Sequence, residues 1–83
     1  MVKAELIDNN FNKMPELCRK YLPKNVEISQ AYNRVGLMYY VAFCNLSTLK
    51  GFMIGIPKGT SFVKAKARII KILKSNQHRK ILL

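Results

Sequence analysis

Residues 57–74 read PKGTSFVKAKARIIKILK, and this stretch decides how the rest of the chain is organised. Pro57 and Gly59 stop any strand that precedes them. Thr60 or Ser61 can cap the first free backbone N–H groups of a helix. The stretch therefore predicts a tight turn followed by a helix that begins at about Ser61.

The predicted helix is amphipathic. At about 100° per residue, Lys64, Arg68 and Lys71 lie away from its apolar face. The apolar face comprises Phe62, Ala65, Ile69, Ile72 and Leu73. The helix start also combines free N–H donors, the positive end of the helix dipole and nearby ammonium groups, an arrangement that suits phosphate. The candidate nucleic-acid contacts are Lys58, Lys64, Lys66, Arg68 and Lys71. An ordinary helix with a solvated cationic face is the alternative.

Charge is distributed unevenly along the 83 residues, whose net charge is +11. All four acids precede residue 28, whereas residues 28–83 carry ten Lys or Arg and no acid. Such a surface repels its own copies and attracts polyanions, so nucleic acid, an anionic membrane or an acidic protein are the leading partner classes. Charge kept only for solubility is the simpler alternative.

Several classes of protein are disfavoured by the composition. No stretch approaches the roughly 20 apolar residues of a membrane span, and the N-terminus lacks a signal peptide, so a cytoplasmic protein is expected. Cys18 and Cys44 are expected to be reduced and mostly buried. With a single histidine, His78, which we expect to be solvated, no metal site, cofactor or catalytic constellation can be assembled. We expect a protein that is not an enzyme.

The remainder of the chain predicts one helix and three strands. Residues 1–10 suit a short edge strand or an ordered leader, and a helix is expected from about Lys13 to Tyr21, with Asn12 as its cap. Strands are expected over residues 26–32, 37–44 and 51–56. The predicted fold is one α+β domain over residues 1–83: helix, three-stranded antiparallel sheet, helix, with both helices on one sheet face. From about residue 76 the chain is basic and then apolar, a tail that can be flexible.

Two short motifs resemble those of double-stranded-RNA-binding domains. Gly36-Leu37-Met38-Tyr39, followed by Phe43, keeps the glycine and the aromatic residue of the family's first motif. Gly59–Lys66 keeps the glycine, serine, alanine and last lysine of the second, with Phe62 and Val63 in place of a lysine pair. The resemblance implies recognition of an A-form duplex by its shape. It places the last helix on phosphates, and the first helix and a strand loop in minor grooves.

The leading hypothesis is a non-catalytic protein that holds structured RNA mainly through phosphate contacts. Tyr32, Tyr39, Tyr40 or Phe52 stacking on single-stranded bases from a sheet face is an alternative way to bind RNA. A second class of function is a small inhibitor or adaptor that docks on an acidic or RNA-bound protein. The composition has the general look of small basic accessory proteins from AT-rich phage genomes, where such a factor would counter a host defence in the host cytoplasm.

A homodimer is the last expectation from the sequence. Val63 and Ile70 lie side by side on the predicted helix, outside the arc needed to cover the sheet. Exposed apolar positions of this kind usually mark an interface. We therefore predict an interface at Val63 and Ile70, which would join two cationic helices into one longer RNA track. A tail that folds back over the helix would hide the same residues in a monomer.

Overall fold

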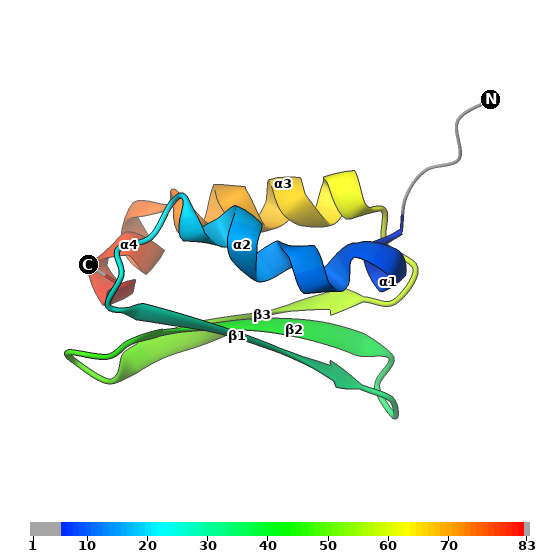
Figure 1. Ribbon diagram of the computed structural model, residues 1–83, viewed down its shortest axis with the longest axis horizontal. Coiled ribbons are helices and arrows are strands. Elements are labelled where there is room, and N and C mark those ends of the chain that lie inside the picture. Colours follow the sequence, from blue (N-terminus) through cyan, green and yellow to red (C-terminus); the bar gives the residue numbers. More distant parts are fainter. Residues whose placement is uncertain (1–5, 83) are drawn as a thin grey trace.

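The computed structural model describes residues 6–82, which form a layer of helices on one face of a three-stranded sheet (Figure 1). The helical elements before the sheet are α1 (Ile7–Asn10), η1 (Phe11–Lys13) and α2 (Met14–Arg19). The strands are β1 (Val26–Asn33), β2 (Met38–Asn45) and β3 (Lys50–Pro57). They are followed by α3 (Phe62–Leu73) and α4 (Asn76–Leu82). The predicted fold class is confirmed.

The sheet is a meander of antiparallel strands in the order β1-β2-β3. β2 is the central strand, and its register pairs Tyr39 with Tyr32 on one side and with Ile56 on the other. Successive side chains of a strand point to opposite faces, so this register fixes which residues meet the helices. Asn33 closes the first hairpin, because its Oδ1 accepts hydrogen bonds from the backbone N–H groups of Val35 and Gly36 at 2.9 and 3.0 Å.

Helix α3 starts where the sequence predicts. Ser61 is its N-cap, and the Ser61 hydroxyl oxygen accepts a hydrogen bond from the backbone N–H of Lys64 at 3.4 Å. Gly59 in the preceding turn has φ +86°, a left-handed conformation that glycine adopts without strain. The chain therefore turns sharply from β3 and lays α3 back across the sheet.

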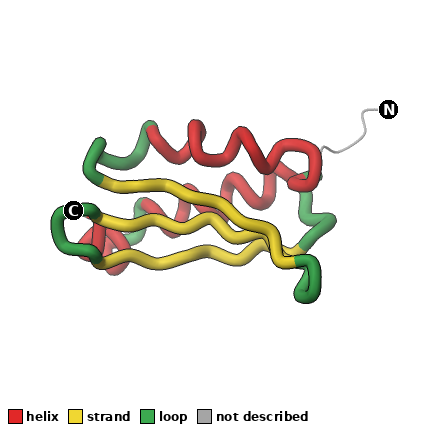
Figure 2. Tube along the Cα trace, turned by 60° about the horizontal axis from the view of Figure 1, so that its bottom comes forward, coloured by secondary structure: helices red, strands yellow, loops and turns green. Residues whose placement is uncertain are grey.

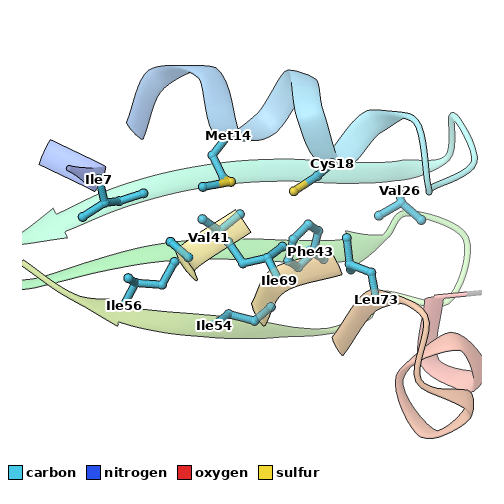
Figure 3. Close-up of a cluster of buried hydrophobic side chains, with 11 residues drawn as sticks. Ile7, Met14, Cys18, Val26, Val41, Phe43, Ile54, Ile56, Ile69 and Leu73 are labelled. Atoms are coloured by element: carbon cyan, nitrogen blue, oxygen red, sulfur yellow. The ribbon is translucent and has the colours of Figure 1, made fainter. Parts of the chain in front are cut away.

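The core lies between the helix layer and the sheet (Figure 3). Met14 and Cys18 project from α2, one turn apart, and Ile69 and Leu73 do so from α3. They close over the inward-facing residues of the sheet, of which Phe43 is the largest fully buried side chain. The remaining buried apolar residues are Ile7, Val26, Val41, Ile54, Ile56 and Ala65.

The N-terminal expectations need correction. Residues 7–13 are helical rather than strand-like, although Leu6 forms an isolated bridge with Ser61; residues 1–5 lie outside the described part of the chain. Asn12 does not cap a helix, since it lies within η1, and α2 begins after Lys13 with no side-chain cap. Pro15 in the first turn of α2 explains the restart, because proline cannot donate the hydrogen bond that would continue the preceding turn.

The C-terminal residues are also more ordered than expected. Instead of a flexible tail from about residue 76, the chain forms α4, which packs against β2 and β3. His78 is half-buried rather than solvated: its ring meets the Phe52 ring edge-on, with centroids 4.6 Å apart. Ile81 also packs against the core. The ring contact of His78 and the packing of Ile81 hold α4 to the domain.

Candidate nucleic-acid interface

Helix α3 presents a row of cations on its outer side. Lys64, Arg68 and Lys71 are exposed and lie on the side of α3 opposite to its buried residues. Lys58 is exposed in the turn before the helix. Within residues 6–82, none of these side chains lies within 4.0 Å of a carboxylate. The row is therefore an unpaired cationic edge of the helix layer, which we call the α3 ridge: Lys58, Lys64, Arg68 and Lys71.

Lys66 does not belong to the α3 ridge. It lines a groove of about 370 Å³ between α2 and α3. Half-buried Leu17 and Phe62 give this groove an apolar floor. Three lysines and one acid surround the floor: Lys13, Lys20, Lys66 and Glu16. We call this site the interhelical groove, and the structure thus divides the five predicted contacts between two surfaces.

The interhelical groove follows from helical spacing. Residues 13 and 20 flank residues 16 and 17 at separations of three and four positions, so all four share the side of the η1–α2 segment that faces α3. Phe62 and Lys66 are four residues apart and share the opposing side of α3. Lys13 and Lys20 were not among the contacts predicted from the sequence, because their charges stand among the acids of the first third of the chain. The spacing itself was the available signal.

An acidic residue occupies the entrance to α3, where the sequence predicts a phosphate site. The Asp8 carboxylate accepts hydrogen bonds from the backbone N–H of Gly59 at 3.1 Å and from the Tyr39 hydroxyl at 2.9 Å. Asp8 is distant in sequence, so no local pattern predicts this contact. The carboxylate places negative charge in the turn beside Lys58, just before the first turn of α3, where it opposes the binding of a phosphate. Phosphate contacts are therefore better made by the side chains of the α3 ridge than by the backbone N–H groups at the start of α3.

A second turn lies beside that entrance. The backbone N–H of Lys58 donates a hydrogen bond to the carbonyl oxygen of Leu37 at 2.9 Å, which joins the β1–β2 turn to the β3–α3 turn. Arg34, exposed in the β1–β2 turn, therefore lies at the same end of the sheet as Lys58. Arg34 was not among the contacts predicted from the sequence, in which this turn was notable only for its glycine.

Two other cations have structural roles. The Arg19 guanidinium donates hydrogen bonds to the backbone carbonyl oxygens of Pro23, at 2.9 Å, and Val26, and so fixes the connection from α2 to β1. The Lys74 ammonium group lies over the Tyr21 ring, 5.4 Å from its centroid. We leave both residues out of the candidate interface for these reasons.

The structure does not favour a sheet face as a platform for bases. Tyr32, Tyr39 and Phe52 point toward the helix layer, where the Tyr39 ring contacts both Tyr32 and Phe11 with centroids 4.5 Å apart. Only Tyr40 of the four proposed aromatics lies on the opposite face. Base stacking on successive aromatics is thus not available on either face of the described sheet.

Two ionisable groups have shifted pKa values. Burial raises the pKa of the Cys18 thiol from 9.0 to about 11, in spite of the neighbouring Arg19. Burial, and then the hydrogen bond to Asp8, raise the pKa of the Tyr39 hydroxyl. Cys44 is a free, half-buried thiol. Both shifts follow from packing, and neither activates a nucleophile.

Val63 and Ile70, the residues predicted to form a dimer interface, lie on one side of α3, as its helical periodicity predicts. Val63 is 72% exposed on α3, and Ile70 is half-buried on the same side of the helix. Both stand next to the interhelical groove, since Phe62 and Lys66 are their neighbours on the wheel. The described tail does not cover Val63.

Comparisons with protein-family models, curated proteins and solved structures found no significant match to this chain. Within residues 6–82, no helix is both long and apolar enough to cross a membrane. In the same described region, no three His, Cys, Asp or Glu side chains are gathered where they could hold a metal ion.

Proposed function

We propose that this protein is a non-catalytic RNA-binding domain that holds structured RNA mainly through phosphate contacts. The observation that carries the proposal is the α3 ridge, in which Lys58, Lys64, Arg68 and Lys71 are exposed and have no carboxylate partner among the described residues. Unpaired cations along one helix attract a regular array of phosphates, and their binding releases the counterions of the nucleic acid. Phosphate contacts fix position and carry no sequence information, so low sequence specificity is expected.

The arrangement of the cations supports structured RNA. Arg34 is exposed in the β1–β2 turn, which a backbone hydrogen bond joins to the turn that carries Lys58 and precedes α3. A rigid set of this kind fits phosphates held at fixed spacing in a helix better than those of a flexible strand. The duplex-binding resemblance of the sequence agrees with this view.

The test is a pair of charge-reversal variants with a matched control. Lys58→Glu with Lys64→Glu should weaken binding to a short RNA duplex by about 10-fold to 100-fold, because two attractions become repulsions. Lys24→Glu with Lys50→Glu changes the net charge equally at the other end of the sheet, before β1 and at the start of β3. Equal losses in the two pairs, with circular dichroism unchanged, would refute a localised site.

The interhelical groove favours a second candidate function, docking on an acidic protein as an inhibitor or adaptor. Its apolar floor of Leu17 and Phe62 would receive an aliphatic side chain, and its three lysines would meet carboxylates on either side. An acidic peptide carrying one leucine is the appropriate probe. Saturable binding of this peptide at moderate salt, together with no binding of RNA, would favour the adaptor over the RNA-binding protein.

A further inference from the structure

The face of the sheet that no described helix covers has an unusual composition. Figure 2 shows the three strands with this face turned forward. In a half-covered antiparallel sheet, the outward side chains are ordinarily polar. Here the register directs mostly small or apolar residues outward, among them Ala31, Met38, Tyr40, Ala42, Met53 and Gly55. We call this surface the open sheet face.

The charge of the open sheet face differs from that of the rest of the protein. No lysine or arginine occupies an outward position of the three described strands, and Glu27 is the one charged residue there. A net charge of +11 is thus carried elsewhere. RNA, anionic lipid and acidic proteins would find no cation on this face, so none of these polyanionic partners fits it.

The side chains of the open sheet face differ in size in a way that would let two identical sheets pack together. Met53 is 62% exposed and stands beside Ala42 in the register. At position 55, an added Cβ would lie 3.0 Å from Met38 Cε and 3.2 Å from Tyr40 Cε1, so these two side chains lean over the glycine. Large side chains therefore alternate with small ones, which lets two copies of the face interdigitate.

We propose that the open sheet face is a homodimer interface, in which two copies pack sheet to sheet. A second copy offers an uncharged, complementary face, and this geometry holds the cationic helix layers of the two copies apart on the outer sides. Dimerisation through Val63 and Ile70 would instead bring two cationic α3 helices together, at an electrostatic cost. The open sheet face is thus the favoured dimer surface, and the interface at Val63 and Ile70 stays a prediction that the experiment below decides.

The area of the open sheet face indicates how tightly two copies of the protein would associate. Three strands about 4.8 Å apart and eight residues long, at about 3.3 Å each, give roughly 350–400 Å² of flat area per copy. Side chains that stand out from the sheet increase the accessible area, but the total stays at the low end for specific interfaces, about 1,200 Å² or less. A weak, concentration-dependent dimer is expected.

The dimer would change how RNA is held, a consequence that rests on the proposed function. With the sheets face to face, the two α3 ridges lie on opposite outer sides of the dimer. Each ridge then binds its own RNA segment, so the dimer bridges two segments and does not extend one continuous track.

Sedimentation without RNA, from about 10 µM to about 1 mM protein and at about 0.15 M salt, tests the interface independently of RNA binding. Wild type should shift from monomer to dimer over this range. Met53→Lys and Ala31→Lys place an ammonium group on the face and should each keep the protein monomeric. Val63→Lys is the matched control, an exposed apolar residue on α3 given the same charge, and should still form the dimer.

Four outcomes would overturn the proposal. They are a wild type that stays monomeric at every concentration, a dimer that survives both sheet variants, equal loss in all three variants, and a dimer lost only in Val63→Lys. The last result would restore the α3 interface predicted from the sequence. Circular dichroism of each variant identifies any loss caused by unfolding, and the two sheet substitutions provide independent tests.

Discussion

The carboxylate of Asp8 accepts a hydrogen bond from the backbone N–H of Gly59, 51 residues later, at 3.1 Å. The same carboxylate accepts a second hydrogen bond, from the Tyr39 hydroxyl, at 2.9 Å. One acid from the N-terminal helix thus ties together the central strand and the turn that begins α3. Its position stabilises the turn and lowers the positive potential next to Lys58.

Replacing Asp8 should affect stability and RNA binding in opposite directions. Asp8→Asn removes the charged acceptor, so the free energy of unfolding should fall by about 1–2 kcal/mol. The same change removes negative charge beside Lys58, so affinity for an RNA duplex should rise by about 3-fold. Urea unfolding and filter binding measure the two effects. A variant with weaker RNA binding and an intact fold would show that Asp8 supports the site directly.

Tyr39→Phe separates the hydrogen bond from the charge. This variant removes the hydroxyl but retains the Asp8 carboxylate, so RNA affinity should stay within about 2-fold of wild type. The folded protein raises the pKa of Tyr39. The stability this group contributes is therefore present below the ordinary tyrosine pKa of about 10 and is lost as pH rises through the folded value. Urea unfolding of wild type and Tyr39→Phe from about pH 8 to 11 should show a steeper fall in wild type.

The two thiols should react at different rates. Burial raises the pKa of Cys18 to about 11, against an ordinary value of 9.0, so its thiolate fraction at pH 8 is lowered by about 100-fold. Cys44 should be the first to react with a disulfide reagent, because it is only half-buried. Cys18→Ala and Cys44→Ala assign each kinetic phase. Comparable rates in the folded protein would contradict the packing of α2 on the sheet, whereas comparable rates in urea are expected.

The packing of α3 on the sheet predicts that substitutions on its two sides change the free energy of unfolding by very different amounts. Ile69 is fully buried, so Ile69→Ala should lower the free energy of unfolding by about 2–5 kcal/mol. Val63 is mostly exposed, so Val63→Ala should change it by less than about 0.5 kcal/mol. Urea denaturation of both variants checks the orientation of α3. Equal losses would mean that the helix is rotated or that Val63 is buried in a dimer.

The contribution of the interhelical groove can be measured separately from that of the α3 ridge. Lys13→Glu with Lys20→Glu reverses two charges on its rim. If RNA lies along the α3 ridge, affinity should fall by about 3-fold at most, because only the general field changes. A loss as large as that of Lys58→Glu with Lys64→Glu would extend the RNA contact across the helix layer and include the groove.

The sequence allowed the strands and α3 to be predicted because their signals are local. Alternation of apolar residues, a proline at the end of β3 and a serine cap before α3 each act within a few residues. The Asp8 contact, the joining of two turns through Lys58 and the packing of His78 on Phe52 depend on tertiary contacts, which no local pattern encodes. The five predicted cations fall on two surfaces for the same reason. Lys66 lines one groove with Lys13 and Lys20 only because α2 and α3 pack side by side.

The central claim is that exposed cations of this domain hold RNA phosphates. The most direct measurement is the affinity for a short RNA duplex, determined by filter binding over a series of salt concentrations. If about four to six phosphates are neutralised, the logarithm of the association constant should fall against the logarithm of salt concentration with a slope of roughly −3 to −5. The Lys58→Glu, Lys64→Glu pair should flatten this slope by about 2. An affinity that does not change with salt, or no RNA binding at low salt, would contradict the account.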